Sequence, residues 1–433
     1  MTTPGKLPGF RDFFPADVVL RNHIFAAWRT VAARYGFEEY EGPPLESLEL
    51  YTRKSGQEIV GQLYEFTDKG GRHVAMRPEM TPTFARMVAS RASQLAKPVR
   101  WFSVPQLYRY ERPQRGRLRE HYQLNMDILG DTGPAGDAEI IAAAIDVLRE
   151  LGLTADDIVV RLSDRVLVGD VLAGAGLDQG ARMTAFAALD RLEKAGRDAV
   201  LAVLHEQGID GERVFGAMES AFGLAPGALG MPGAREDVQL PEATAGNLGE
   251  VFALLEHGGY GPFVQFDPGL VRGLAYYTDT VFEIWERTGE LRAICGGGRY
   301  DTLLASLTRV DLPAAGFGMG DVVLGELLGD RGLVPESSAR IDDYVVCVSE
   351  DARPAALRLA RQLRDTGRRV RLDLHLRGVG KQFKAANRCG AGRAIVLGPE
   401  ELARGVAKIR EMAGGGEVEV SLETLARTGG GPG

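Results

Sequence analysis

The stretch PQLYRYERPQRGRLREHYQLNMDI, residues 105–128, carries the pattern that decides the fold. From His121 to Ile128, polar and apolar side chains alternate, which is typical of a β-strand with one face on the core. The preceding segment, 104–111, also has strand character, and a long polar loop that contains Gly116 separates the two. We therefore predict an antiparallel hairpin. One face of its second strand carries the polar residues Gln123, Asn125 and Asp127.

Positive charge is concentrated in the same hairpin. Arg109 and Glu111 lie near the end of the first strand, and the loop adds four arginines, at positions 112, 115, 117 and 119. An arginine can clamp a phosphate with two hydrogen bonds, and a carboxylate such as Asp127 can bind an amine. A site with both groups suits a zwitterion, or a nucleotide together with an amino compound. The alternative is a charged hairpin that is exposed to solvent.

The sequence around this hairpin predicts further strands and many helices. Helical spacing over 18–36 stops at a glycine, and 37–51 contains a short strand that two prolines interrupt. An Ala- and Leu-rich helical pattern over about 165–255 predicts an inserted helical subdomain. Strand character returns at 262–285 and again at 291–296.

Three short motifs admit a structural explanation as well as a functional one. Thr81, followed by a proline, is a good N-cap for the helix after it, and Glu79 would interact with the dipole of that helix. The glycines at 296–298 offer backbone amides to a ligand, although such a run is more often a strand bend. Gly316–Gly320 is expected to form a turn before an apolar helix, which resembles an anion site at a helix N-terminus.

About the last ninety residues are predicted to fold as an independent α/β unit, because strand and helix patterns alternate there. The domain limits follow from this pattern. We expect one domain over 1–329, a linker over 330–342, the α/β domain over 343–427 and a disordered tail over 428–433.

The composition is that of an ordinary globular protein, since 45% of the 433 residues are hydrophobic and 25% are charged. No apolar run reaches the ~18 residues that span a membrane, and the N-terminus lacks the apolar stretch of a signal peptide. Three scattered cysteines and six histidines without suitable spacing predict neither a disulfide framework nor a metal site. We therefore expect a cytoplasmic protein without a membrane partner.

The net charge of −8 argues, at first, against a nucleic-acid partner, but the charge is unevenly distributed. Residues 343–433 carry +5, which leaves −13 for the rest of the chain. Within that unit, 353–393 hold twelve basic residues against two acidic ones. Such a surface suits the phosphate backbone of a nucleic acid, and a solvated helix face explains the charge equally well.

Four motifs in the expected order give the chain a resemblance to the histidyl-tRNA synthetases, which are class II aminoacyl-tRNA synthetases. Residues 109–123 resemble class II motif 2 in its histidine-specific form. Residues 270–278 and 297–301 resemble the two histidine signatures, and 316–327 lie where motif 3 belongs. The N-terminal segment 8–15 and the C-terminal unit are also similar to their counterparts in this family, so the resemblance covers nearly the whole chain.

The resemblance implies an α+β fold: a class II antiparallel sheet with flanking helices, a helical insertion, and a C-terminal α/β anticodon-binding domain. It also implies a homodimer with residues 37–51 at the interface. The implied reaction uses ATP, with Mg²⁺, to activate L-histidine as an adenylate, and then transfers the histidine to tRNA(His).

The same resemblance assigns site residues. Arg109 and Arg272 would be catalytic, Arg109 as a clamp on the α-phosphate and Arg272 as an electrostatic catalyst in place of a general base. Glu111 would read the adenine amino group, and Arg117 would also bind ATP. The implied histidine site comprises Glu79, Met80, Thr81, Arg109, Gln123, Asp127 and Arg272, with Tyr276 and Tyr277 at the imidazole. The residues expected to bind tRNA are Arg368, Arg369, Arg371, Lys381 and Lys384.

Three residues depart from the family pattern. Motif 3 normally ends in an arginine that meets the adenine and the γ-phosphate, whereas Val323 stands at that position here. Ala275 stands where an aspartate is usual, and Met80 where a glycine is usual. Because the valine removes a cation from the triphosphate site, either another basic residue or Mg²⁺ takes over, or ATP chemistry is impaired.

The missing arginine keeps a second function open. Synthetase-like paralogues act as regulatory subunits of ATP phosphoribosyltransferase in histidine biosynthesis. Such paralogues typically lack the anticodon-binding domain, and they have no need of a basic arm in the motif 2 loop. This chain is predicted to have both features.

Overall fold

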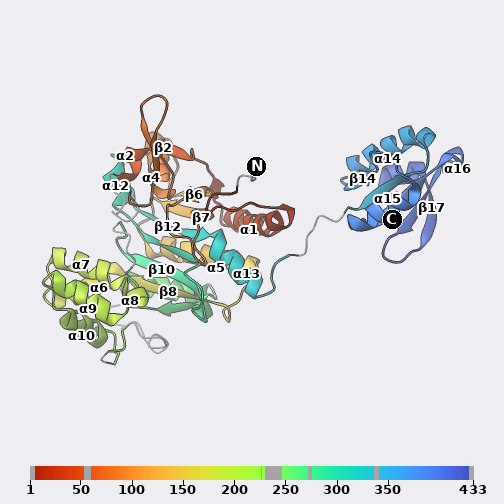
Figure 1. The fold of residues 1–433 in the computed structure, drawn as a ribbon. Helices are drawn as coiled ribbons and strands as arrows, with labels where there is room; N and C mark the ends of the chain where they lie inside the picture. Colours follow the sequence, from red (N-terminus) through yellow and green to blue (C-terminus); the bar gives the residue numbers. More distant parts are fainter. Residues whose placement is uncertain are drawn as a thin grey trace. The chain divides into compact units, whose positions relative to one another are not determined.

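The computed structural model describes residues 5–52, 60–225, 227–229, 246–271, 276–335 and 341–428, except for the side chains of residues 193 and 194. The chain divides into two compact units, Met1–Val334 and Pro335–Gly433 (Figure 1). The predicted linker, 330–342, begins at the last residue of a helix, and 336–340 lie outside the described residues. Of the predicted tail, 428–433, only Thr428 is described, as the last residue of a helix.

The first unit is built on a large, mostly antiparallel sheet. Its strands lie in the order β1-β5-β7-β12-β11-β10-β8-β9, and β6 pairs with β7 beside this path. Each neighbouring pair is antiparallel except β1–β5 and β8–β9, so the predicted antiparallel sheet is confirmed. The strands are β1 (Glu38–Glu39), β5 (Val99–Ser103), β6 (Gln106–Tyr108), β7 (Glu120–Leu129), β8 (Ile158–Asp164), β9 (Val264–Phe266), β10 (Thr280–Glu286), β11 (Cys295–Arg299) and β12 (Ala314–Gly320).

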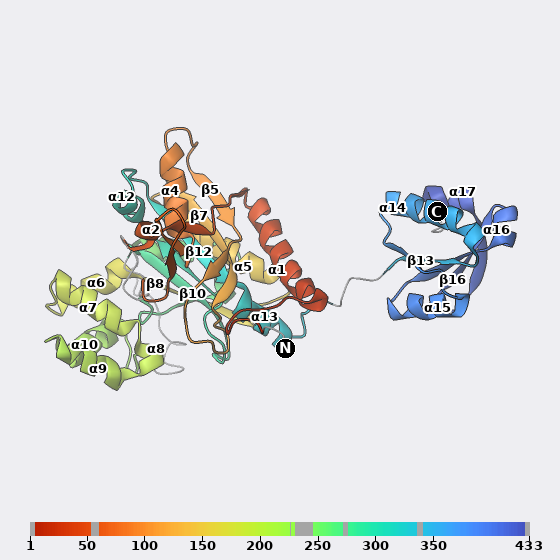
Figure 2. The same cartoon turned by 45° about the horizontal axis from the view of Figure 1, so that its top comes forward.

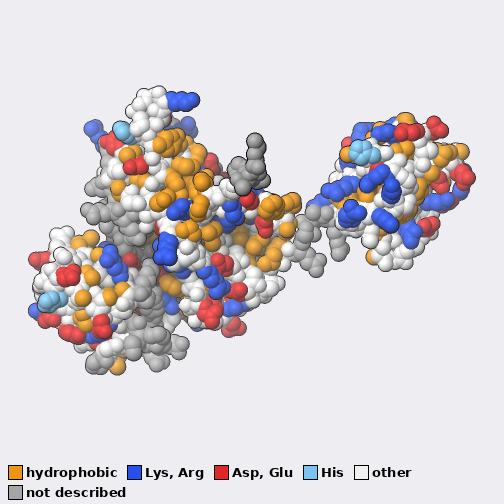
Figure 3. Space-filling view, viewed as in Figure 1, with side chains coloured by type: hydrophobic (Ala, Val, Ile, Leu, Met, Phe, Trp, Pro, Cys, Tyr) orange, Lys and Arg blue, Asp and Glu red, His pale blue; other side chains and the backbone are white. Residues whose placement is uncertain are grey.

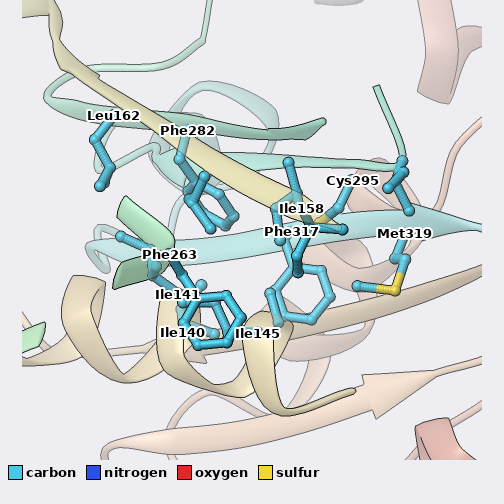
Figure 4. Packing of buried hydrophobic residues seen from close by; sticks show 14 of the residues in the cluster. Ile140, Ile141, Ile145, Ile158, Leu162, Phe263, Phe282, Cys295, Phe317 and Met319 are labelled. Carbon is cyan, nitrogen blue, oxygen red and sulfur yellow. The ribbon is translucent and has the colours of Figure 1, made fainter. Parts of the chain in front are cut away.

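Helices cover one face of this sheet. α1 (Pro15–Arg34), α5 (Pro134–Glu150) and α13 (Asp321–Asp330) lie on the same side, and Figure 2 shows them together. Alternate residues of each strand point toward these helices, so that Ile141 and Ile145 of α5 lie near Phe317 of the sheet (Figure 4). Each large apolar side chain buried in this layer contributes about 1.5–3 kcal/mol, which holds the helices on the sheet.

The strand limits differ from the sequence prediction at three places. Gly316–Gly320, predicted as a turn, forms most of β12, because pairing with β7 and β11 on both edges outweighs the weak strand preference of glycine. The strand expected at 291–296 begins only at Cys295 and continues to Arg299 as β11, so the glycines at 296–298 are paired strand residues. The first hairpin strand is limited to β6, because the chain turns where the Glu111 N–H donates to the Arg109 carbonyl (2.8 Å).

The remaining elements of the first unit surround the sheet. α4 and α12 pack against each other, and helices α6 to α10 form a separate group in Figures 1 and 2, within the range predicted for the helical insertion. α11 falls in the same predicted range and packs against α5. The small sheet β2-β4-β3 lies beside α2. These elements are β2 (Leu45–Ser47), α2 (Leu48–Thr52), β3 (Tyr64–Thr67), β4 (His73–Met76), α4 (Thr81–Arg91), α6 (Arg165–Gly174), α7 (Gln179–Leu189), α8 (Leu192–Ala195), α9 (Arg197–Glu206), α10 (Gly211–Ala221), α11 (Gly246–His257), η2 (Gly261–Phe263) and α12 (Leu303–Leu307).

The second unit is an α/β domain whose sheet has the order β14-β13-β15-β16-β17. β13 is parallel to β14 and β15, whereas β16 and β17 continue the sheet antiparallel, so the partly parallel sheet predicted for this unit is confirmed. α14 and α17 cover one face and α15 covers the other. The elements are β13 (Asp343–Cys347), η3 (Glu350–Ala352), α14 (Arg353–Asp365), β14 (Val370–Leu372), α15 (Val379–Arg388), β15 (Arg393–Leu397), α16 (Pro399–Ala403), β16 (Val406–Glu411), β17 (Glu417–Ser421) and α17 (Leu422–Thr428). Across the described part of both units, no helix has the length and hydropathy of a membrane span.

Candidate active site

The sheet face opposite α1, α5 and α13 forms the floor of a large cleft with a volume of about 1180 Å³. Its lining follows the two-residue period of the strands. Gln123, Glu283 and Gly318 face the cleft, while their chain neighbours belong to the core beneath the sheet. Of the polar face of β7, Gln123 lines the cleft, and Asn125 and Asp127 are buried, so the alternative of a solvent-exposed hairpin is wrong for this strand.

Glycines of β12 make room for the polar side chains of β7. A Cβ atom built on Gly316 would lie 2.2 Å from Asp127 Oδ1, and one built on Gly318 would lie 2.8 Å from Gln123 Cδ. At Gly316 an added Cβ atom would also lie 2.7 Å from the backbone carbonyl oxygen of Met126, so no side chain fits there, whereas at Gly318 the flexible end of Gln123 would have to shift. These glycines form a floor on which Asp127 and Gln123 lie. The glycine run thus serves the site through the absence of side chains rather than as a turn at the start of a helix.

Asp127 is buried, with 5% of its surface exposed. The Tyr300 O–H donates to Asp127 Oδ1, and burial raises the pKa of this carboxyl to about 7. The ring of Tyr276 lies 5.0 Å from that of Tyr277 and 5.9 Å from that of Tyr300, measured between centroids. Tyr300 therefore joins Asp127 to the two predicted tyrosines. It is absent from the predicted site, and its one sequence signal is its place in the motif at 297–301.

The residues predicted to bind ATP also line the cleft. Arg109 Nε donates to the Pro78 carbonyl (2.9 Å), and Arg117 Nε forms an ion pair with Glu111 Oε2 (2.6 Å). His121 lines the same part of the cleft. Burial, and next the positive charge of Arg109, lower the pKa of its imidazole to about 3, so this ring is neutral at pH 7. This region therefore combines a neutral imidazole with arginines that can bind an anion.

The start of α4 corrects the predicted helix cap. The helix begins at Thr81, and its N-cap residue is Met80, which makes no capping hydrogen bond. Thr81 is thus the first residue inside the helix and not its N-cap. Met80 is buried against the cluster that contains Tyr277, and Glu79 beside it is buried too. Glu79, Met80 and Thr81 thus lie together at this helix start.

Two positions named from the sequence lie outside the described residues, namely Arg272 and Ala275. The role predicted for Arg272 therefore stays a prediction. Val323, the departure in motif 3, is described: it is buried in α13 and lines the cleft.

Known proteins match this chain over both of its units. The histidyl-tRNA synthetase family model matches residues 9–320, and an anticodon-binding-domain model matches residues 343–428. The chain belongs to the histidyl-tRNA synthetase family. The predicted helical insertion and the two histidine signatures lie within the region that the first model matches, and so do all lining residues of the cleft except Val322 and Val323.

Individual relatives in this family cover nearly the full length. The histidine–tRNA ligase of Opitutus terrae is 44% identical over 98% of this chain and 98% of its own length. The chloroplastic/mitochondrial histidine–tRNA ligase of Arabidopsis thaliana is 38% identical, over 96% of this chain and 85% of its own length. The crystal structure of histidyl-tRNA synthetase from Nostoc superposes with a TM-score of 0.79 over 99% of both chains, at 24% identity, which shows the shared fold.

In the anticodon-binding unit, the basic residues predicted to bind tRNA differ in their surroundings. Arg368 Nη2 donates to the fully buried Asp343 (Oδ1, 3.1 Å), so its guanidinium supports the interior of the domain. Arg369 is exposed, and its backbone N–H donates to Asp342 (2.7 Å). Figure 3 shows Lys and Arg side chains gathered on part of this unit. Three predicted residues are exposed and form no ion pair within the described residues: Arg371, Lys381 and Lys384.

Arg299, in the second histidine signature, supports the sheet from the side away from the cleft. Arg299 is 1% exposed, and its guanidinium forms an ion pair with Asp137 of α5 (Nη2–Oδ1, 2.8 Å). It also donates to the carbonyls of Asp131 (2.8 Å) and Gly133 (2.9 Å). The arginine of this motif therefore fixes β11 to the start of α5, while the next residue, Tyr300, belongs to the site.

Replacing Arg299 with alanine is expected to lower the free energy of unfolding by about 3–5 kcal/mol, because the buried Asp137 loses its ionic partner. Urea unfolding of the full chain measures this loss. The matched control is Arg29→Ala, which breaks an exposed ion pair with Glu39 and is expected to cost less than about 1 kcal/mol. Equal losses in the two variants would contradict the structural role of Arg299.

Proposed function

We propose that this chain is a histidine–tRNA ligase, which activates L-histidine with ATP and then attaches the histidine to tRNA(His). The observation that carries the proposal is one sheet face that holds two kinds of binding group. Asp127 and Gln123 lie on the glycine floor of that face, and Arg109 and Arg117 line the cleft above it. An amino acid needs a carboxylate for its amine, and a nucleotide needs cations for its phosphates. The membership of the family supplies the identity of both substrates.

Adenylate formation sets an electrostatic requirement that these residues fit. The carboxylate of histidine attacks the α-phosphate of ATP, so two anions meet and cationic groups must offset their charge. We assign this role to Arg109, whose Nε bond to the Pro78 carbonyl fixes the guanidinium beside the cleft. By family resemblance, Arg272 acts on the other side of the reacting groups, and no proton needs to be removed by a general base.

The histidine site is proposed to lie around Asp127. The carboxylate of Asp127, with Glu79, Thr81 and Gln123, would bind the ammonium group of the substrate. Tyr276 and Tyr277 would contact the imidazole, and the pair stands beside Tyr300 in the same aromatic cluster. Binding a cation next to Asp127 would lower the pKa of this carboxyl from about 7, so that the substrate itself stabilises the charged form.

The ATP site is proposed to use Arg109, Glu111 and Arg117, with Mg²⁺ bound chiefly by the phosphates. Within the described residues, no cluster of three acidic, histidine or cysteine side chains could hold a metal ion alone. Mg²⁺ accepts a site with one or two carboxylates plus phosphate oxygens, and Glu283 is a carboxylate on the cleft floor that fits this need. The ion would neutralise charge on the phosphates.

The alternative function, a regulatory subunit of ATP phosphoribosyltransferase, is less supported. The match to an anticodon-binding domain covers residues 343–428, and that domain has no purpose in a subunit that does not bind tRNA. The loop arginines are present in the structure as well, where Arg115 forms ion pairs with Glu326 (3.1 Å) and Asp330 (3.2 Å) of α13.

Histidine-dependent ATP–pyrophosphate exchange, followed by charging of tRNA(His), tests the proposal directly. Exchange is expected with L-histidine and not with other amino acids, and transfer is expected to tRNA(His). A well-folded protein without exchange would reject the ligase function. Exchange without charging would limit the function to histidine activation.

We also propose that the chain forms a homodimer with residues 37–51 at the interface. The small sheet that contains β2 exposes the apolar side chains of Leu45 and Phe66, which a partner subunit would cover. A cytoplasmic location is proposed because tRNA is the substrate and the cysteines are few and scattered.

Replacing Arg371, Lys381 and Lys384 together with glutamine is expected to weaken tRNA(His) binding and to flatten its salt dependence. Each lost phosphate contact removes about 0.7–0.9 from the slope of log affinity against log salt concentration, so a decrease of roughly two to three is expected. Histidine-dependent exchange should not change, because that chemistry lies in the first unit. Binding measured at several salt concentrations gives the slope.

The matched control for the tRNA experiment removes the same charge from residues that already have acidic partners. Arg404, Lys408 and Arg410 already form ion pairs with Glu419, Glu401 and Glu417. Their replacement by glutamine is expected to leave the slope nearly unchanged. If the first triple variant also keeps the wild-type slope, the basic surface of this unit is only a solvated helix face.

A further inference from the structure

The position of the missing motif 3 arginine can be located in the structure. Val323 lines the cleft, and its Cγ2 would lie 3.1 Å from a Cβ atom built on Gly116 of the motif 2 loop. Gly116 is held in place because its N–H donates to Glu326 of α13 (3.0 Å). The valine thus packs against the loop that also carries Arg117. A cation that serves the triphosphate in its place must reach this corner of the cleft.

Arg292 reaches the same corner from a different part of the chain. It lies in the segment 287–294 between β10 and β11, lines the cleft and is half-buried. Its Cδ would lie 3.6 Å from the Cβ atom built on Gly116. The stem of Arg292 and the side chain of Val323 are therefore neighbours over the same loop glycine.

Arg292 differs from the other described arginines that line the cleft, because each of the others has a protein partner. Arg109 and Arg287 donate to backbone carbonyls, Arg117 pairs with Glu111, and Arg161 lies 4.7 Å from the ring of Trp285. Arg292 forms no hydrogen bond or ion pair with the residues that the structure describes. Its guanidinium is free to bind an anionic ligand.

We propose that Arg292 binds the triphosphate of ATP and supplies the cation that Val323 cannot. The inference rests on the proposed function, since it assumes that ATP occupies this cleft. It resolves how an enzyme of this family can use ATP without an arginine at position 323.

The electrostatics around Arg292 agree with this role. Burial, and next the charge of Arg117, lower the pKa of the guanidinium, while Glu111 opposes them. Arg292 thus lies beside a second guanidinium in a partly buried corner, and Arg117 disfavours its positive charge while Glu111 favours it. A phosphate group would relieve both the repulsion and the desolvation, and charge-assisted hydrogen bonds to phosphate are among the strong ones.

Binding of ATP and of adenosine to the full chain, measured by titration calorimetry, tests the proposal. Arg292→Ala is expected to weaken ATP binding roughly 10- to 100-fold, as the loss of a charge-assisted hydrogen bond to phosphate predicts. Adenosine has no phosphate, so its affinity should stay within about twofold of wild type. If Arg292 has only a structural role, its replacement should lower the affinities for ATP and adenosine by similar factors. In the Arg292→Ala background, Val323→Arg is expected to recover part of the ATP affinity.

Arg287→Ala is the matched control, because it removes the same charge from the same segment. The Arg287 guanidinium donates to the carbonyl of Pro262 (3.0 Å), so ATP affinity should change less than about threefold. The proposal is overturned if Arg292→Ala binds ATP within threefold of wild type, or if adenosine loses as much affinity as ATP. Histidine-dependent exchange by the wild-type protein is a separate readout. Its absence would reject the ligase function, while the two titrations still decide whether Arg292 binds phosphate.

Discussion

Replacing Asp127 with asparagine is expected to reduce histidine-dependent ATP–pyrophosphate exchange by about a hundredfold or more. The carboxylate is a buried anion at the proposed histidine site, and an amide of the same shape carries no charge. Removing one preorganised polar group from an active site costs on the order of 3 kcal/mol in transition-state stabilisation. Exchange measured over a range of histidine concentrations would show the loss chiefly as a higher KM for histidine.

The same variant is expected to be more stable than the wild type at neutral and higher pH. The folded-state pKa of Asp127 is about 7, above its ordinary value of 3.8, so the fold favours the protonated form. The resulting stabilisation is complete below about pH 4 and is lost as the pH rises through 7. Asparagine stays neutral throughout. At pH 8 we therefore expect the free energy of unfolding of Asp127→Asn to exceed that of the wild type by roughly 2–4 kcal/mol, which thermal unfolding would show as a higher melting temperature. At pH 5 the difference in free energy should be smaller.

The control for Asp127→Asn is the same chemical change at Asp190, which also lines the cleft. Asp190→Asn is expected to keep exchange within about threefold of wild type and to show no comparable gain in stability at pH 8. If Asp127→Asn retains nearly full exchange, the ammonium group binds elsewhere. If it loses exchange without becoming more stable, the raised pKa of Asp127 is wrong.

Local patterns were sufficient to predict the strand that carries the site. The alternation over 121–128 identifies β7 and the face of Gln123 and Asp127, because the period of two is a property of the strand itself. The glycine run at Gly316–Gly320 gave the wrong local structure. Its strand conformation depends on pairing with β7 and β11, which no local pattern reports. Only the structure shows why glycines are needed there, because the side chain of Asp127 occupies the space that a side chain at Gly316 would fill.

Contacts between distant residues explain what else the sequence could not reveal. Tyr300 and Asp127 are 173 residues apart in the chain, and their hydrogen bond joins the carboxylate to the aromatic cluster of the site. Arg292 is a single arginine in an irregular segment, and its proximity to Val323 depends on the motif 2 loop that lies between them. In the sequence, Arg368 is one of many positive charges in a basic segment. The structure shows that its guanidinium donates to the buried Asp343. In each case the residue type was known and its partner was not.

Replacing Gly316 of the glycine floor with alanine is expected to reduce histidine-dependent exchange by more than about a hundredfold. An added Cβ atom would lie 2.2 Å from Asp127 Oδ1 and 2.7 Å from the Met126 carbonyl oxygen. The second neighbour is backbone in a paired strand and cannot rotate away. The methyl group must therefore displace the Asp127 carboxylate or separate β12 from β7, and lower stability is expected as well.

Gly320→Ala separates this steric effect from the general loss of a glycine on the same strand. A Cβ atom at Gly320 would meet nothing within 4 Å, and the residue has a φ of −84° that alanine adopts without strain. Gly320→Ala is therefore expected to keep exchange within about threefold of wild type, with circular dichroism confirming that both variants are folded. Near-normal exchange in Gly316→Ala would show that β12 and β7 can move apart without disturbing the histidine site. Such a result would remove the physical reason for a glycine at this position, because the carboxylate of Asp127 would then not depend on the space that Gly316 leaves.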